Sequence, residues 1–185
     1  MEKFRNRNFC LVLYPNEDES HRNAIDKIKK SYDYALINHD SDLKDYETGE
    51  LKKEHTHVVL HFTNAIWSTK LAKDLGILEN YIEECRDLKR ALAYLIHYYD
   101  NDKYQYDIKN VHGTLKKKLE IVLRNDDKTE SEKIIEILNY IDAFEYEILM
   151  SDFIRYCAEV GYWDVFRRSY NALYTYIQEH NRKLT

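Results

Sequence analysis

Residues 54–62 alternate between two kinds of side chain, and this pattern predicts a half-buried strand. Histidine stands at positions 55, 57 and 61, whereas the even-numbered positions from 56 to 62 are β-branched or apolar. Because successive side chains on a strand point to opposite faces, the histidines share one face and the other face is suited to cover a core. Imidazoles two residues apart are separated by about 7 Å along the strand, so both can reach a single divalent cation.

The same periodicities predict the order of elements in the first part of the chain. They indicate strands at 8–14, 33–38, 54–62 and 81–85, and helices at 20–31, 64–75 and 87–99. Asn64 is expected to cap the second of these helices and Gly76 to end it, and a further short strand is predicted at 103–108. The order βαββαβ is typical of the ferredoxin-like fold, an α+β arrangement. We therefore predict an antiparallel sheet with helices on one face, and expect the histidine face to be open.

Beyond about residue 125 the apolar pattern becomes purely helical. Thr129 and Glu132 fit a capping box, which predicts the start of a helix, and apolar residues then recur at helical spacing. The sequence thus predicts an α+β domain at 1–120 followed by an all-α domain at 128–185.

The composition is that of a globular chain without long flexible linkers. Of 185 residues, only 4 are Gly and 1 is Pro, while charged residues make up 33%. The three cysteines lie far apart, which argues against a disulfide scaffold or a thiolate zinc site and fits a reducing compartment. The sequence has neither an apolar run long enough to span a bilayer nor the apolar core of a signal peptide. We expect a cytoplasmic protein with no membrane partner.

The net charge of −5 is unevenly distributed. Residues 119–185 carry 8 basic and 13 acidic side chains, whereas residues 1–118 carry 20 of each. The balanced first part has room for a local basic patch against phosphates, and the acidic second part is a poor ligand for DNA. Lys52, Lys53 and Lys103 are candidate DNA contacts, although each also fits an ordinary solvated surface position.

A second polar segment lies upstream, where a short apolar run ends in His39, Asp40 and Asp42. If a neighbouring strand brings this segment beside His55 and His57, three imidazoles and a carboxylate gather at one point. The candidate metal ligands are therefore His39, Asp42, His55 and His57, with Asp40 as the alternative carboxylate. Such donors suit Mn²⁺ or Mg²⁺, and zinc would fit them as well. A single His-x-His pair also occurs by chance, so the prediction depends on the two segments meeting.

The predicted helix at 87–99 offers a nucleophile. On a helix Tyr94 would share a face with His97 and Tyr98. A phenol attacks a phosphodiester well only when a cation polarises the phosphate and neutralises the charge that develops. The products would be a covalent phosphotyrosine and a free 3′-hydroxyl.

The sequence contains several short motifs in a characteristic order. They are FCLVLYP at 9–15, NHDSD at 38–42, HTH at 55–57 and AYLIH at 93–97, followed by DKYQY at 102–106. In this order they resemble the rolling-circle replication initiators of small plasmids, the RepB-type branch of the HUH endonucleases, named after their His-hydrophobe-His motif. Thr at the middle position is a mild departure that still suits a packed face. The resemblance covers roughly residues 7–112 well and the helical tail more loosely.

The resemblance implies the HUH endonuclease fold and a role for each site residue. Mn²⁺ or Mg²⁺ would be held by His39, Asp42, His55 and His57. Tyr94 would nick one strand at the plasmid double-strand origin, forming a 5′-phosphotyrosine and leaving a 3′-hydroxyl that primes rolling-circle replication. Tyr98 is the alternative nucleophile, and His97 would orient the phosphate or the phenol.

The resemblance also implies partners. The substrate would be plasmid origin DNA, single-stranded or extruded as a hairpin. The helical domain at 128–185 would assemble the protein into a homo-oligomer such as a ring. A host helicase and a host DNA polymerase would continue replication from the nick.

Other functions stay open at this point. A mobilisation relaxase or a viral initiator would share the fold, although relaxases usually carry three histidines and viral initiators add a helicase domain, whose Gly-x-x-x-x-Gly-Lys loop this sequence lacks. A two-histidine phosphoesterase needs two His-x-Thr/Ser motifs on apolar strands, which His39 and His112 do not both provide. A non-catalytic origin-binding protein or repressor with a structural metal would bind DNA and leave it uncut.

Overall fold

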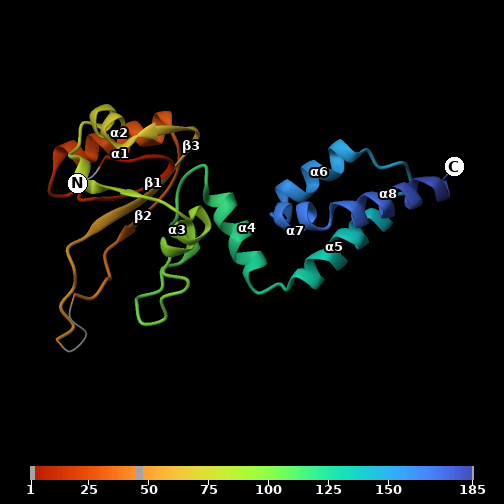
Figure 1. Ribbon diagram of the computed structural model, residues 1–185. Helices are drawn as coiled ribbons and strands as arrows, with labels where there is room; N and C mark the ends of the chain where they lie inside the picture. Colours follow the sequence, from red (N-terminus) through yellow and green to blue (C-terminus); the bar gives the residue numbers. More distant parts are fainter. Residues whose placement is uncertain (1–2, 45–47, 185) are drawn as a thin grey trace. The chain divides into compact units, whose positions relative to one another are not determined.

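The computed structural model describes residues 3–44 and 48–184, and the chain divides into two compact units, Met1–Leu119 and Glu120–Thr185 (Figure 1). In chain order the first unit contains β1 (Arg5–Leu13), α1 (Glu19–Ser31), β2 (Asp33–His39), β3 (His55–Trp67), α2 (Ser68–Leu75), the 3₁₀ turn η1 (Glu79–Tyr81), β4 (Ile82–Glu84), α3 (Leu88–Tyr94) and the 3₁₀ turn η2 (Ile108–Asn110).

The four strands form one antiparallel sheet with the order β2-β3-β1-β4. The pairing of β2 with β3 begins with Asp33 opposite His61 and ends with His39 opposite His55. This strand order and the sequence of elements are those of the ferredoxin-like arrangement, so the predicted α+β fold is confirmed.

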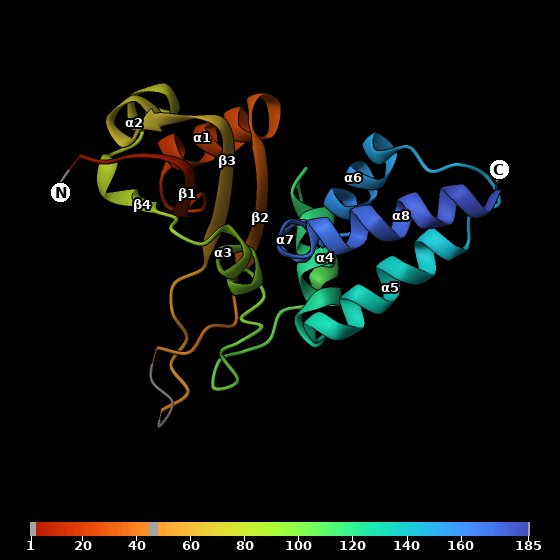
Figure 2. The ribbon, with the colours of Figure 1, turned by 45° about the vertical axis from the view of Figure 1, so that its right-hand side comes forward.

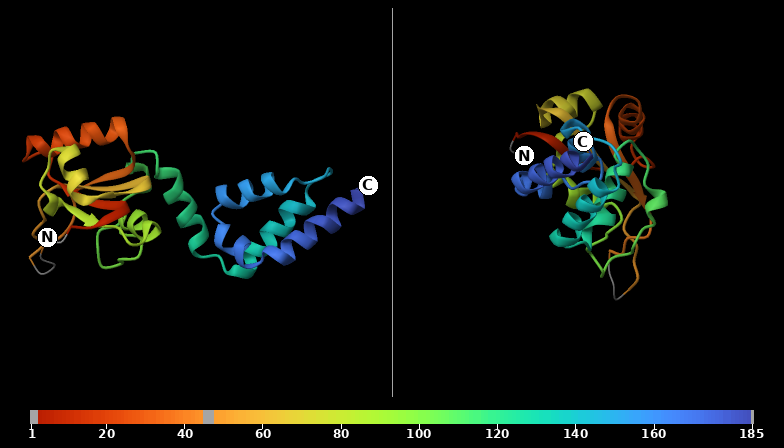
Figure 3. Two further views of the ribbon diagram at one scale, coloured as in Figure 1. Left: turned by 45° about the horizontal axis from the view of Figure 1, so that its top comes forward. Right: turned by 90° about the vertical axis from the view of Figure 1, so that its right-hand side faces the viewer.

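One face of the sheet is covered by α1 and α2 (Figure 3). Phe9 and Leu11 of β1 and Val58 and Leu60 of β3 are buried there against apolar residues of both helices. Fully burying one such side chain contributes about 1.5–3 kcal/mol, so the alternation seen in the sequence fixes which face of β3 turns inward. The histidines therefore lie on the opposite face.

The strand β3 is longer than predicted. After a β-bulge, β1 continues to pair with β3 until Arg5 lies opposite Trp67. Asn64 consequently lies inside a strand rather than at a helix cap, and α2 begins only at Ser68. The other end of this helix is as expected, because Gly76 adopts the left-handed conformation that ends it.

The helix α3 packs on the histidine side of the sheet, which is therefore only partly open (Figure 3). It ends at Tyr94, so the predicted helix at 87–99 is too long. The chain leaves it through a Schellman motif, in which the His97 N–H donates to the carbonyl of Tyr94 (3.0 Å) and the Tyr98 N–H to that of Ala93 (3.1 Å). His97 takes the left-handed position of this motif, with φ of 56°, where glycine is usual.

The prediction of a strand at 103–108 is wrong, because all of these residues are described and none belongs to a strand. The edge strand β2 pairs instead with a later residue, because Leu36 and His112 exchange two backbone hydrogen bonds of 2.8 and 2.9 Å. Gly113 makes this approach possible. Its φ is 121°, and a Cβ atom there would lie 2.2 Å from the carbonyl oxygen of Tyr34.

The rest of the chain is helical, as predicted beyond about residue 125, and the helix before that point was not predicted. This part of the chain contains α4 (Lys116–Asp126), α5 (Glu130–Asp142), α6 (Met150–Glu159), α7 (Trp163–Arg168) and α8 (Tyr170–Leu184). The capping box is present, since the Thr129 hydroxyl accepts from the Glu132 N–H (3.2 Å). Helices α5 and α8 lie side by side, and with α6 and α7 they enclose a core that includes Ile141, Phe153 and Leu173 (Figure 2). None of the described helices is both long and apolar enough to cross a membrane.

Candidate metal and nucleophile site

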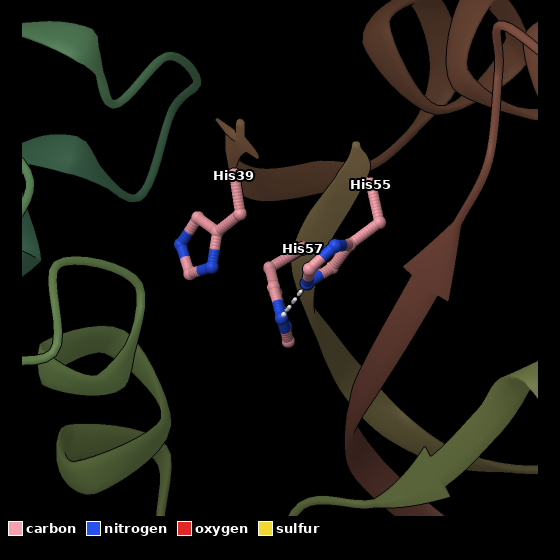
Figure 4. Close-up of side chains that lie close together, drawn as sticks. All are labelled: His39, His55 and His57. Carbon is pink, nitrogen blue, oxygen red and sulfur yellow. Dashed lines mark hydrogen bonds between the residues drawn. The ribbon is translucent and has the colours of Figure 1, made fainter. Parts of the chain in front are cut away.

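Three histidines from two adjacent strands converge at one end of the sheet (Figure 4). His39 is the last residue of β2 and lies opposite His55, the first residue of β3, while His57 follows two positions later on the same face. The His55 and His57 Nε2 atoms are 3.1 Å apart, and the His39 ring centroid is 4.5 Å from that of His57. One ring nitrogen from each lies within 4.8 Å of the others, a spacing that allows a shared metal ion. The predicted meeting of the two segments is therefore observed.

Hydrogen bonds to carbonyl oxygens fix the tautomers of two of these rings. The His39 Nε2 lies 2.8 Å from the Leu95 carbonyl oxygen, and the His55 Nδ1 lies 2.7 Å from that of Lys53. A carbonyl oxygen only accepts, so both of these ring nitrogens carry hydrogen when the rings are neutral. The His39 Nδ1 and the His55 Nε2 are then left with lone pairs, which is the arrangement of metal-binding histidines that donate their other N–H to a backbone carbonyl.

Asp42 faces these lone pairs. Its Oδ2 atom lies 3.3 Å from the His39 Nδ1 and 3.7 Å from the His55 Nε2. A carboxylate oxygen and two ring nitrogens with lone pairs lie this close together only with a cation or added protons between them. A metal ion with bonds of about 2.1 Å to each atom would fit between atoms at these separations. The residues present thus fit a divalent metal ion. Asp40 is exposed and accepts instead from the Ser41 hydroxyl (2.8 Å), so Asp42 is the carboxylate of the cluster.

The electrostatics of the cluster keep its donors in the forms that bind a metal. Burial, with a contribution from the neighbouring imidazoles, lowers the pKa of His57 to about 3. Burial also lowers the pKa of His39. Burial by itself would raise the pKa of Asp42, but His39 and the hydrogen bond from Tyr106 outweigh it, and that pKa is lowered. Neutral imidazoles beside an ionised carboxylate are ready ligands at neutral pH.

Tyr106 supports the carboxylate, a role that the sequence did not reveal. Its hydroxyl donates to the Asp42 Oδ1 (3.0 Å) and accepts from the Ser41 N–H (3.0 Å). Its ring stacks on His39, with centroids 4.2 Å apart and planes at 10°. In a chain with 17 tyrosines, neither its type nor its spacing distinguished this residue.

His97 is buried beside the cluster rather than displayed on a helix surface. Its Nδ1–H donates to the Tyr104 carbonyl oxygen (2.8 Å) and lies 3.8 Å from the Asp42 Oδ1. Its Nε2 is buried and has no hydrogen-bond partner among the described residues. A second trio, formed by His39, Asp42 and His97, also has ligand atoms within 4.8 Å of one another. The left-handed turn after α3 is what carries this ring inward.

Tyr94 lies at the edge of the cluster and is 40% exposed. Its ring centroid is 5.5 Å from that of His57, and its hydroxyl accepts a hydrogen bond from the Lys103 Nζ (3.1 Å). Burial would lower the pKa of Lys103, but its hydrogen bonds to Tyr94 and Asp100 outweigh this effect and raise it. A lasting positive charge therefore faces the phenol oxygen. Tyr98, predicted to share a helical face with Tyr94, instead packs its ring against that of Tyr99 (5.0 Å).

The predicted DNA-contacting lysines do not all lie together. Lys52 and Lys103 line one small pocket with Asp42. Lys53 instead forms an exposed ion pair with Glu17 (3.0 Å). Two of the three lysines thus stand beside the cluster.

Comparisons with known proteins point to plasmid replication. A family described as "Plasmid replication protein, origin binding domain" matches residues 1–120. A protein named "Replication protein" from Onion yellows phytoplasma (strain OY-M) is 30% identical over 95 residues. That match covers 46% of this chain and 25% of the relative, so the chain spans well under two thirds of that protein's length.

Proposed function

The chain belongs to the plasmid replication proteins with an origin-binding domain, and from this premise we propose that it nicks one strand of its plasmid origin with Tyr94 as the nucleophile. The observation that carries the proposal is the position of Tyr94, whose ring lies 5.5 Å from His57 at the edge of the converging ligand atoms. A phosphodiester bound by a cation at this cluster would lie within reach of the phenol oxygen.

The proposed reaction is a transesterification. The Tyr94 phenol oxygen forms a bond to the phosphorus of the scissile phosphodiester, and the bond from phosphorus to the 3′ oxygen breaks. The exposed phenol gives its proton to solvent, and the departing 3′ oxygen takes up a proton. The 5′ phosphate remains on Tyr94, and the free 3′-hydroxyl primes leading-strand synthesis.

In this proposal His39, Asp42, His55 and His57 hold Mn²⁺ or Mg²⁺. When bound there, the cation would polarise the scissile phosphate and neutralise developing charge. His97 and Tyr106 act through Asp42, because both lie against its Oδ1 atom. Their contribution is to hold the carboxylate in place.

Lys103 has a separate part. Its ammonium group donates to the Tyr94 hydroxyl and also lies 4.6 Å from the centre of the Tyr94 ring. Charge on the phenol oxygen, which develops when this oxygen attacks and again when it departs on religation, is stabilised by a cation at this distance. The same cation is near enough to contact the entering phosphate.

The second unit is proposed to assemble the protein into a homo-oligomer such as a ring. Several large apolar side chains of this unit are exposed: Ile135, Tyr146, Leu149, Trp163, Tyr170 and Tyr174. Exposed aromatic residues are enriched at contacts with other proteins, and the acidic excess disfavours DNA. A host helicase and polymerase are the proposed partners after the nick.

The test is a cleavage assay with Mn²⁺ on supercoiled plasmid and on single-stranded oligonucleotides that carry the origin. Wild type should give nicked DNA and, on a denaturing protein gel, a slower covalent band that requires the metal. Tyr94→Phe should abolish the band and spare DNA binding, whereas the matched variants Tyr98→Phe and Tyr99→Phe should retain it. Bound but uncut DNA with the wild-type protein would favour a non-catalytic origin-binding protein instead.

A further inference from the structure

A pocket of about 430 Å³ opens beside the nucleophile, on the histidine face of the sheet. Tyr94 and His57 belong to its wall, so it is continuous with the site at which a phosphate is proposed to react. Val12 of β1 and Val59 of β3 give it an apolar floor. A pocket of this kind, with an apolar floor and an aromatic edge, is suited to a planar ring.

Two opposite charges border the pocket. Arg90 comes from α3 and Glu83 from β4, and both side chains are exposed. Within the described parts of the chain, neither forms an ion pair, with the other or with a third residue. The pocket lining therefore offers a fork of N–H donors and a pair of carboxylate acceptors, with both still available to a ligand.

This combination matches one nucleobase particularly well. Arginine donates in bidentate fashion to the O6 and N7 atoms of guanine, the commonest specific contact between a side chain and a base. A carboxylate accepts from the amino group that guanine carries on C2 and from its N1–H. The apolar floor and the Tyr94 ring supply the stacking surface that single-stranded bases need.

We propose that this pocket binds a guanine of the cleaved DNA strand, in the nucleotide next to the phosphate that Tyr94 attacks. The inference rests on the proposed function for the position of that nucleotide. It adds a determinant of where the strand is cut, because a base held by Arg90 and Glu83 fixes which phosphate stands before the phenol.

The test separates binding from cleavage. In the binding arm, Tyr94→Phe protein selects from a pool of randomised single-stranded oligonucleotides, and the dissociation constants of the selected sequence and its analogues are then measured. Replacing the selected guanine by 7-deazaguanine removes N7, the acceptor for Arg90, and replacing it by inosine removes the amino group that Glu83 would accept from. Each should weaken binding roughly 5- to 150-fold, the effect of one good base contact.

The assignment to residues comes from adding second substitutions. With Arg90→Ala the penalty for 7-deazaguanine should disappear, and with Glu83→Ala the penalty for inosine should disappear. Lys89→Ala is the matched control, because it removes a positive charge from the neighbouring position of α3 and does not alter the pocket lining. All three side chains are exposed, so folding should be little affected.

In the cleavage arm, wild-type protein acts on the same oligonucleotides and the cut positions are sequenced. The cut should fall next to the selected guanine. The inference is overturned if no guanine is selected, or if the analogue penalties are the same with and without Arg90 and Glu83. Selection of guanine without any cleavage would contradict the nicking function and leave the pocket assignment standing. Cleavage without a base preference would support the nicking function and overturn the pocket assignment.

Discussion

Tyr106→Phe is the substitution that most sharply tests how the metal site is built. It removes one oxygen atom and keeps the ring that stacks on His39. That oxygen makes two hydrogen bonds of 3.0 Å, one to the Asp42 Oδ1 and one from the Ser41 N–H. Burial raises the pKa of the Tyr106 phenol, so it is protonated at neutral pH and donates to the carboxylate.

Two separately measurable effects follow from this geometry. In metal-free protein, leaving buried partners of the hydroxyl unsatisfied should cost about 1–3 kcal/mol in free energy of unfolding. In addition, Asp42 loses the group that orients it, and losses of such supporting hydrogen bonds typically weaken metal binding roughly 10- to 100-fold. The two are measured by urea unfolding in the presence of a chelator and by titration calorimetry with Mn²⁺.

Tyr104→Phe is the matched control, because its ring contacts that of Tyr106 and its side chain is exposed. It should leave both quantities nearly unchanged. The reasoning would be refuted if Tyr106→Phe bound Mn²⁺ as tightly as the wild type, or if both substitutions weakened binding equally.

Three further predictions follow from other parts of the first unit. His97→Gly should be more stable than His97→Ala by about 1–2 kcal/mol in urea unfolding, because only glycine adopts φ of 56° without strain; equal stabilities would contradict this. Metal-free protein should lose stability as the pH falls from 7 towards 4, because the unfolded chain takes up protons near the ordinary histidine pKa while folded His57 resists them down to about 3; the loss should be smaller in His57→Gln, and an unchanged slope would argue against it. Gly113→Ala should destabilise the first unit by about 2–3 kcal/mol, the upper part of the usual range for single substitutions, because its Cβ would meet the Tyr34 carbonyl oxygen; a variant with wild-type unfolding behaviour would show that the backbone relaxes there.

The parts of the site that the sequence predicted are those governed by strand periodicity. His55 and His57 had to share a face, and Val58 and Leu60, which occupy the alternate positions, had to turn towards the helices. The pairing of β2 with β3 then brought His39 and Asp42 beside them, which is the meeting of segments on which the prediction depended.

The parts that the sequence missed depend on contacts between distant segments. Nothing local required the helix to end after Tyr94, because the left-handed position of the turn is held by a histidine rather than by the glycine that normally marks it. The support of Asp42 by Tyr106 spans 64 positions in the sequence. The extension of β3 past Asn64 likewise depends on the partner strand, whose pairing overrides the capping preference of a single asparagine.

The most direct test of the central claim is to locate the covalent link. After reaction of wild-type protein with an origin oligonucleotide and Mn²⁺, trypsin releases the peptide from Ala91 to Lys103, which contains Tyr94, Tyr98 and Tyr99. Fragmentation of this peptide in a mass spectrometer should place the nucleotide phosphate on Tyr94. A phosphate on either of the other two tyrosines, or nicked DNA with no modified peptide, would contradict the account.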